Sequence, residues 1–189
     1  TDLFVPKQEQ RKEKEIVMVG RINPSKRYED MIIALRSMEG LVHVSIVGRT
    51  QKDIESNLYY DELEGLIQGN DLQHRVSFVQ GTSYEDMPYV YQSADMLVNT
   101  SDTDSMDKVV LEAMACGTIP ITSNNAYKDM LQPLGLWVEK RDLEALRYAI
   151  TQIVDMPAIE KEKLRTTLRD IVVNDHSLEA LITKIAAIK

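Results

Sequence analysis

The stretch from Val98 to Ile121 constrains the fold more than any other part of the chain, because it contains the whole pattern of a β-α-β unit. Two short apolar runs form its ends. Between them an acidic loop, 101–107, leads directly into a helical pattern, Lys108–Ala115. The first backbone amides of a helix have no intrahelical partner and attract an anionic group. The sequence therefore predicts an anion site where this loop meets the helix.

Apolar runs of strand length recur along the chain and alternate with helical patterns. Six strands are expected, at 16–19, 42–47, 76–79, 96–100, 118–122 and 136–138. Helices are expected at 28–38, 54–67, 83–93, 108–115, 124–131 and 142–154. Nearly continuous aliphatic strands, each followed by an amphipathic helix, are typical of a parallel sheet covered on both faces. We therefore predict an α/β fold with a doubly wound, six-stranded, Rossmann-like parallel sheet.

The two ends of the chain depart from this alternation. Residues 1–15 are polar, contain Pro6 and finish in a charged run, so we expect a solvated lead-in rather than core. Two consecutive helical patterns, 158–173 and 177–188, close the chain without a strand between them. The expected organisation is a lead-in over 1–15, one Rossmann-like domain over 16–157 and extra C-terminal helices over 158–189.

Composition excludes several classes of function. The formal net charge of −8 disfavours nucleic acid and anionic lipid as partners, because both require a basic surface. No apolar run approaches the roughly 20 residues of a membrane span, and the N-terminus lacks a secretion pattern. The single cysteine, Cys116, permits no disulfide within the chain and is expected to be a small buried side chain. The three histidines have no ligand spacing, so no metal site is predicted. We expect a cytoplasmic protein without a membrane span.

Polar residues follow three of the predicted strands and should meet at one rim, because ligands of such sheets bind beyond the carboxyl ends of the strands. Arg21 and Lys26 flank a turn that contains Pro24, and Gly48 and Arg49 follow the second strand. The two cations Arg21 and Lys26 can together neutralise a diphosphate, Arg as a planar fork and Lys as a point charge. Taken alone, such a pair fits an ordinary solvated surface as well.

Three of the acids in or just after the 101–107 loop are candidates for the site. Glu112 can accept two hydrogen bonds from a vicinal diol such as a ribose, or it can simply favour the helix dipole. Asp104 and Asp107 can belong to the anion site, or they can be a loop acid and a helix N-cap. The chain carries no serine nucleophile elbow, P-loop or complete G-x-G-x-x-G motif. Hydrolase, NTPase and dinucleotide-binding functions therefore lose their usual sequence support.

Several motifs, taken in order, resemble the C-terminal, donor-binding half of the GT-B glycosyltransferases, specifically the retaining group 1 family that is also numbered family 4. These motifs cover nearly the whole chain: Asp2-Leu-Phe-Val-Pro6, Val19-Gly-Arg21 with Lys26, Val44-Ser-Ile-Val-Gly48, Val76-Ser-Phe-Val-Gln-Gly81, Tyr91-Gln-Ser-Ala-Asp95, and Val109-Val-Leu-Glu-Ala-Met-Ala-Cys-Gly117 ending at Pro120. The resemblance implies a glycosyltransferase that takes a sugar from a nucleoside diphosphate, UDP- or GDP-linked, and transfers it with retention of configuration. It also implies a metal-independent site with no cofactor.

The resemblance implies a role for each site residue. Arg21 and Lys26 would be catalytic residues on the donor diphosphate, and Asp104, the first acid of the family's paired motif, would be the catalytic contact to the transferred sugar. Glu112, the second acid, would bind the ribose. A site without a metal must stabilise the leaving group with fixed cations and amide dipoles. The remaining donor-binding positions lie in the loop and the first helical turn: Ser105, Met106, Asp107, Lys108 and Val109.

The loop departs from the family pattern, because Glu-Gly-Phe-Gly is replaced by Asp104-Ser-Met-Asp107. Asp104 is one methylene shorter than Glu, so its reach to sugar hydroxyls is reduced. Asp107 replaces a glycine that lets phosphate approach the backbone, and its carboxylate can occupy the helix N-terminus itself. Two alternatives therefore stay open: a non-catalytic regulatory or interaction module of the same fold, and a sugar-nucleotide epimerase.

Family members also carry an N-terminal acceptor-binding domain, which the motifs of this chain do not include. We expect the isolated chain to bind donor without transferring sugar, because the absent domain positions the acceptor, be it a glycan, a lipid or a small molecule. The resemblance implies that the last helix packs on that domain with an apolar strip made of Leu178, Leu181, Ile182, Ile185 and Ile188. Peripheral membrane association of the full-length protein is left as an alternative to a purely cytoplasmic location.

Overall fold

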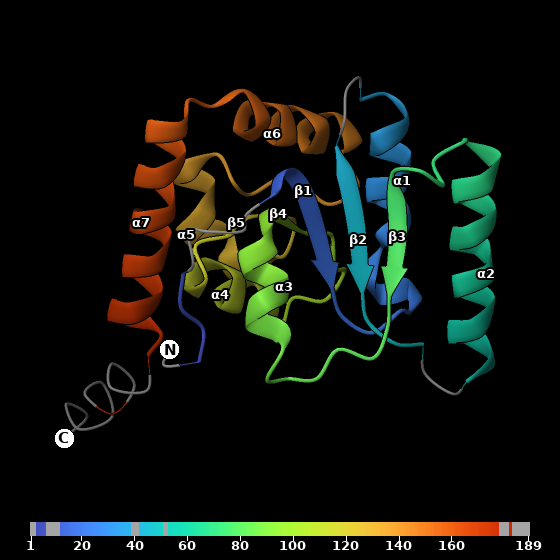
Figure 1. Ribbon diagram of the computed structural model, residues 1–189, viewed down its shortest axis with the longest axis horizontal. Helices are drawn as coiled ribbons and strands as arrows, with labels where there is room; N and C mark the ends of the chain where they lie inside the picture. The colour runs from blue at the N-terminus through green and yellow to red at the C-terminus, as the bar shows by residue number, and fades with distance from the viewer. Residues whose placement is uncertain (1–2, 7–11, 39–41, 51–52, 178–181, 183–189) are drawn as a thin grey trace.

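A five-stranded parallel sheet with helices on both faces forms the centre of the molecule (Figure 1). The computed structural model describes residues 3–6, 12–38, 42–50, 53–177 and 182. The strand order is β3-β2-β1-β4-β5, which is the order of a doubly wound fold whose chain reverses direction next to β1. The strands are β1 (Lys12–Val19), β2 (His43–Val47), β3 (Val76–Val79), β4 (Ala94–Asn99) and β5 (Ile119–Thr122).

The helices form two layers, with α3 in front of the sheet and α1 behind it in Figure 1. Helix α4 packs against α3 and α7 in one layer, and α1 packs against α2 and α6 in the other. The helices are α1 (Tyr28–Arg36), α2 (Ile54–Gly69), α3 (Met87–Ser93), α4 (Lys108–Ala115), α5 (Lys128–Leu131), α6 (Leu143–Asp155) and α7 (Ala158–Asp175). Short 3-10 turns are η1 (Pro24–Lys26), η2 (Asn125–Tyr127) and η3 (Gln132–Leu134).

The parallel sheet supplies the core because its strands are apolar on both faces. Every residue of β4 and β5 is buried, and both strands lie between helices. The bounds of α4 agree with the sequence expectation, and Cys116 just after this helix is buried as expected. Of the helices in the described residues, none is both long and apolar enough to cross a membrane.

The prediction of a sixth strand at 136–138 is wrong. This segment runs beside β5 and forms a single parallel bridge between Thr122 and Trp137. Two backbone hydrogen bonds hold it, from the Thr122 amide to the Leu136 carbonyl and from the Val138 amide to the Thr122 carbonyl, each 3.0 Å long. The chain then turns at Arg141, which has a positive φ of 64°, and Asp142 caps α6. The turn ends the pairing before a strand can form.

Other boundaries differ from the expectation in smaller ways. Helix α3 begins at Met87 rather than at residue 83, and the expected helix at 124–131 is divided into η2 and α5. The lead-in is not wholly solvated: β1 already begins at Lys12, and Phe4 is buried with only 6% of its surface exposed. The expected last helix, with most of its apolar strip, lies outside the described residues. Ile182, which is described, is 57% exposed.

The ends of β1 and β2 approach each other so closely that one of them requires glycine. A Cβ atom added to Gly48 would lie 1.9 Å from the carbonyl oxygen of Gly20, far inside van der Waals contact. The Gly20 amide donates to the Val47 carbonyl at 3.0 Å, and this bond holds the two strand ends together. The absence of a side chain at residue 48 therefore determines the shape of the rim beyond these strands.

Candidate functional site

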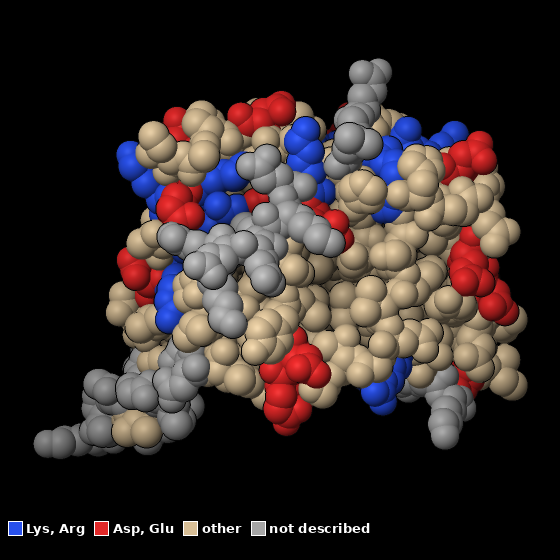
Figure 2. Space-filling model, viewed as in Figure 1, with Lys and Arg blue, Asp and Glu red and all other residues tan. Residues whose placement is uncertain are grey.

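The loops that follow the strands meet at one edge of the sheet, as the sequence predicted. Backbone hydrogen bonds join them: the Ile22 amide donates to the Arg49 carbonyl at 3.0 Å, and the Asp102 amide donates to the Ser25 carbonyl at 2.9 Å. The first bond connects the loops after β1 and β2, and the second connects the loops after β1 and β4. This edge lies at the lower side of Figure 2, where acidic and basic side chains form separate groups.

A hollow of about 280 Å³ opens beyond the carboxyl ends of β1, β2 and β3. Three glycines, Gly20, Gly48 and Gly81, line this hollow and let a ligand approach the backbone. Arg21 also lines it and is exposed, and no ion pair joins Arg21 or Arg49 to any described residue. Larger hollows lie between η1 and α2, where Pro24 of the loop after β1 forms part of the wall, and on α7.

Lys26 and Asp107 form an ion pair where the loop after β1 faces the start of α4. The Lys26 ammonium lies 3.1 Å from Asp107 Oδ1 and 3.0 Å from Oδ2, and both side chains are 15% exposed. The Asn99 amide donates to Asp107 Oδ2 at 3.2 Å. Asp107 occupies the N-cap position of α4 but makes no capping bond with its side chain. The expected contact of its carboxylate with the helix N-terminus is therefore replaced by the contact with Lys26.

Glu112 is held by a buried tyrosine of the neighbouring helix. The Tyr91 hydroxyl donates to Glu112 Oε2 at 2.7 Å. Burial, followed by the charge of Glu112, raises the pKa of Tyr91 well above its ordinary value, so the hydroxyl keeps its proton and the carboxylate is the acceptor. This bond fixes one oxygen of the acid that the sequence assigned to a ribose.

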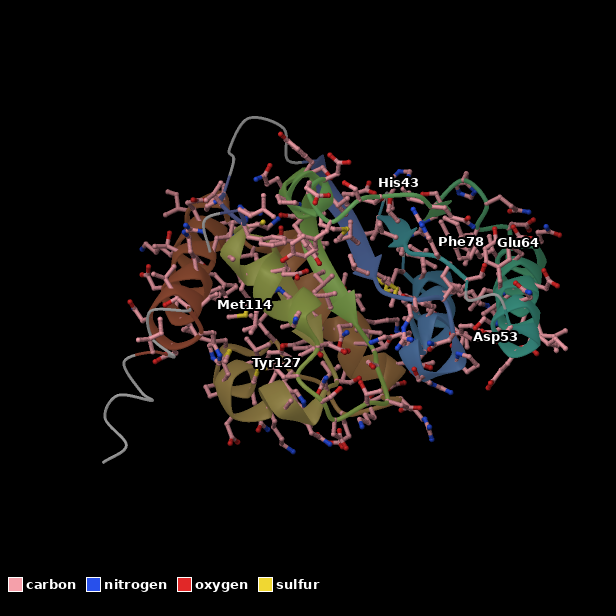
Figure 3. All side chains as sticks on the ribbon, turned by 90° about the horizontal axis from the view of Figure 1, so that it is seen from below. His43, Asp53, Glu64, Phe78, Met114 and Tyr127 are labelled. Atoms are coloured by element: carbon pink, nitrogen blue, oxygen red, sulfur yellow. The ribbon has the colours of Figure 1, made fainter. Side chains whose placement is uncertain are left out.

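Tyr127 connects the surroundings of Glu112 and Asp107. Its hydroxyl donates to the Asp107 carbonyl at 2.6 Å. Burial raises the pKa of Tyr127, and the charges of Asp107 and Glu112 raise it further. Figure 3, seen from this end of the sheet, labels Tyr127 beside α4. Lys26 pairs with Asp107 at the N-cap of α4, and Glu112 lies on the same helix, so the three residues share one neighbourhood.

Asp104 lies apart from that neighbourhood, on the outer side of the loop. Its side chain is 62% exposed, and it accepts hydrogen bonds from Lys140 at 2.8 Å and from Asn125 at 3.1 Å. The hydrogen bond from the Lys140 ammonium holds the pKa of Asp104 below its ordinary value. The backbone carbonyl of its neighbour Ser105 accepts a hydrogen bond from the side-chain amide of Asn124 at 2.7 Å. The loop is therefore anchored in a form that keeps Asp104 charged.

The remaining predicted positions surround the start of α4. Met106 is 47% exposed, Lys108 is exposed and Val109 is half-buried. The roles assigned to all these residues remain predictions. In the described part of the chain, no group of His, Cys, Asp and Glu is arranged to hold a metal ion.

Sequence reasoning missed the partners of the site residues: Tyr91, Asn99, Tyr127 and Lys140. Tyr91 is completely buried. The available signal was its position in the Tyr91–Asp95 motif, directly before β4. That position is compatible with many partners, so it did not identify Glu112.

Comparison with known proteins identifies one family. The sequence profile of the family described as "Glycosyl transferases group 1" matches residues 1–170. The mannosylfructose-phosphate synthase of Agrobacterium fabrum is 27% identical over 110 residues, which is 56% of this chain and 24% of that protein. An uncharacterized glycosyltransferase of Methanocaldococcus jannaschii is 26% identical over 145 residues, covering 75% of this chain and 36% of that protein. The chain therefore spans about a quarter to a third of these curated relatives.

Solved structures show the same fold. Sucrose-phosphate synthase from Thermosynechococcus elongatus superposes with a TM-score of 0.87 at 27% identity, covering 98% of this chain and 48% of that chain. Anabaena Alr3699/HepE, solved in complex with UDP, superposes with a TM-score of 0.82 at 20% identity, over 92% of this chain and 48% of that chain. The C-terminal domain of a group 1 glycosyl transferase (LpcC) from Francisella tularensis gives a TM-score of 0.81 at 17% identity, covering 94% of this chain and 97% of that domain.

Proposed function

The chain belongs to the group 1 glycosyltransferases, and from this membership we propose that it binds a nucleoside-diphosphate sugar beyond the carboxyl ends of β1, β2 and β4. The observation that carries the proposal is the common neighbourhood of Lys26, the start of α4 and Glu112. A cation, a row of unpaired helix amides and a diol acceptor are the three groups that a nucleoside diphosphate requires.

Each residue has a distinct task in this proposal. Arg21 and Lys26 neutralise the diphosphate, and the amides at the start of α4 point their dipole at the same charge. Glu112 accepts hydrogen bonds from the ribose. Asp104, on the outer side of the loop, contacts the transferred sugar. The backbone of 105–109 lines the space between them. Fixed cations and dipoles of this kind would stabilise the diphosphate as it leaves, without a divalent ion.

The hollow beside Arg21 offers room for the nucleoside part of the donor. Three glycines line it, so recognition of the base would rely on backbone groups. The structures of Alr3699/HepE in complex with UDP and with UDP-glucose support uridine nucleotides as the first ligands to test on this chain. GDP-linked donors are the second choice.

The proposal extends to sugar transfer by the whole protein. There, an acceptor of unknown class, which can be a glycan, a lipid or a small molecule, would be positioned by residues outside this chain. The sugar would be transferred with retention of configuration. Binding without turnover is the expected behaviour of the 189-residue chain.

Calorimetry tests the proposal directly. Titration of the chain with UDP, GDP, ADP and the corresponding sugar nucleotides should give saturable heat for at least one base. Glu112→Ala and Arg21→Ala should each weaken that binding about tenfold or more, because a hydrogen bond to a charged group contributes roughly 1.5–3 kcal/mol. Ile159→Ala, on the exposed surface of α7, provides a control far from the site. Saturable binding that neither site variant changes would refute the placement.

One observation favours a second candidate function, a non-catalytic module of the same fold. The Asp107 carboxylate already satisfies Lys26, so the cation meant for phosphate has an internal partner. If the wild-type chain gives no saturable heat with any nucleotide but Asp107→Asn does, the Lys26–Asp107 pair blocks the site. The non-catalytic function is then the better description.

A further inference from the structure

We propose that Tyr91 is a positioning residue for the donor site: its hydroxyl sets the orientation of the Glu112 carboxylate, and through it the preference for ribose over deoxyribose. The inference rests on the proposed function, because it concerns the acid assigned to the sugar of the nucleoside. It adds a residue on α3, a helix to which the sequence assigned no donor contact.

The Tyr91 side chain has almost no freedom to move. Its ring is completely buried, and its hydroxyl donates to Glu112 Oε2 at 2.7 Å. Its carbonyl accepts from the Thr118 hydroxyl at 2.5 Å, which ties this turn of α3 to the start of β5. A donor fixed at both its backbone and its ring holds the acceptor in one orientation.

The protonation of the pair gives the bond a fixed direction. Burial keeps the proton on Tyr91, so its hydroxyl donates to the Glu112 carboxylate. A carboxylate offers about four lone-pair sites on its two oxygens, and this bond uses one site on Oε2. No other hydrogen bond or ion pair to the Glu112 side chain is present among the described residues, so Oε1 is left to accept from a ribose hydroxyl.

Orientation matters here because Glu112 is only half-buried on the surface of α4. A glutamate in this position can rotate about its terminal torsion, which is broad rather than confined to narrow wells. Each bound diol would then have to stop that rotation. With the hydroxyl of Tyr91 in place, the carboxylate is already ordered before the nucleotide arrives, which favours binding.

The packing of the Tyr91 ring does not depend on its hydroxyl, so the hydroxyl can be removed without disturbing the fold. The Phe4 ring lies 6.1 Å from the Tyr91 ring at a tilt of 54°. The residues around Phe4 are tied to the same layer: the Val5 carbonyl accepts from Gln92 Nε2 at 2.6 Å, and the Phe4 carbonyl accepts from Arg169 at 3.2 Å. Tyr91→Phe keeps every one of these contacts and removes only the bond to Glu112.

The experiment measures how well the chain distinguishes ribose from deoxyribose. UDP and GDP are titrated by calorimetry, each beside its 2′-deoxy counterpart, into the wild-type chain and into Tyr91→Phe. We expect the variant to lose about fivefold to tenfold in affinity for the ribonucleotide. This loss is smaller than the one expected for Glu112→Ala, because the carboxylate itself is still present. Its affinity for the deoxynucleotide should change by less than about twofold. The ratio of ribonucleotide affinity to deoxynucleotide affinity should therefore fall.

The chain offers a matched control on α2. Tyr60 donates to Glu64 Oε1 at 2.9 Å, which is the same pair of groups far from the site. Tyr60→Phe should leave both affinities unchanged. In a Glu112→Ala background, Tyr91→Phe should have no further effect on ribonucleotide binding, because the group that it positions is gone.

The possible results separate this inference from the function on which it rests. If the wild type prefers the ribonucleotide and Tyr91→Phe keeps the same preference, the positioning role is overturned while the donor site stands. An equal loss for both sugars, or a loss that persists in the Glu112→Ala background, also overturns it and indicates a structural role. If the wild type binds no nucleotide, the proposed function fails and this inference fails with it.

Discussion

The ammonium of Lys26 lies 3.0 Å from Asp107 Oδ2, so the cation assigned to the donor diphosphate already faces an anion of the protein. The two residues are separated by 81 positions in the chain and are brought together by the meeting of the β1 loop with the start of α4. Asn99 supports the carboxylate from the end of β4. A donor phosphate that approaches Lys26 therefore competes with Asp107.

Replacing Asp107 should strengthen nucleotide binding. In Asp107→Asn the shape is kept and the competing charge is removed, so we expect affinity for UDP or GDP to rise about threefold to tenfold, or roughly 0.7–1.4 kcal/mol. The gain should shrink at high salt, because the competition is electrostatic and the pair is partly exposed. Calorimetry at two salt concentrations measures both effects.

The matched control for Asp107→Asn is Glu144→Gln, which changes the net charge equally. The Glu144 side chain is 90% exposed on α6, and its contact with Arg147 is 3.8 Å long. It should leave binding unchanged. A weaker binding by Asp107→Asn would contradict the competition and would make Asp107 a residue that positions Lys26.

Gly48→Ala should destabilise the fold and distort the rim. The new methyl group would lie 1.9 Å from the Gly20 carbonyl oxygen, so the ends of β1 and β2 must separate. We expect the free energy of unfolding to fall by about 3 kcal/mol, the upper part of the usual range for overpacking. Urea denaturation measures the loss.

The control for Gly48→Ala is Gly65→Ala in the middle of α2, where an added Cβ meets no atom within 4 Å. Alanine is the better helix former, so this variant should gain roughly 0.5–1 kcal/mol. Equal effects of the two substitutions would show that the close approach of Gly20 and Gly48 is not what limits residue 48.

The sequence predicted some elements to the residue. The apolar run at 76–79 becomes β3 with the same bounds, and Lys108–Ala115 becomes α4. The run at 136–138 is also apolar but forms only one bridge, and the chain turns at Arg141 soon after it. Composition does not distinguish a strand from a segment that pairs over a single residue.

The sequence predicted the place of the site better than its contacts. The carboxyl ends of parallel strands must lie at one edge, so the nearness of the Lys26 and Asp107 segments follows from the fold class. Which side chains bond depends on rotamers and on helix packing between distant segments. Tyr91 and Glu112, 21 positions apart on α3 and α4, meet only because these two helices pack together.

Asp104 should titrate below the ordinary range of aspartate. Its pKa is lowered chiefly by the hydrogen bond from Lys140, so the pair stabilises the fold above the unfolded-state pKa of about 3.9. That contribution is lost as the pH falls through the depressed pKa of the folded state. Carbon-13 NMR of the carboxyl group should show the low midpoint, and Lys140→Met should move it back toward the ordinary value.

Lys163→Met removes the same charge from the exposed side of α7 and is the control for Lys140→Met. It should leave the Asp104 midpoint where it is. A midpoint that moves equally in both variants would point to the overall charge of the chain instead of the bond at 2.8 Å.

Among the charged residues that the structure describes, Asp95 should be the most sensitive to substitution. Its side chain is 1% exposed at the start of β4, and it pairs with Lys161 at 3.1 Å and with Arg165, both on α7. Asp95→Asn keeps the size but removes the buried anion that faces both cations, and it leaves Arg165 with only the exposed Glu162 as a counter-charge. We expect the free energy of unfolding to fall by about 3–5 kcal/mol, as for other buried pairs that lose one partner. Urea denaturation measures the loss.

The control for Asp95→Asn is Glu162→Gln. Glu162 also faces Arg165, at 3.6 Å, but its side chain is 56% exposed. Because surface pairs contribute about 0–1 kcal/mol, the control should lose far less. A loss in Asp95→Asn no larger than in the control would mean that the packing of α7, and not this charge cluster, holds the helix on the sheet.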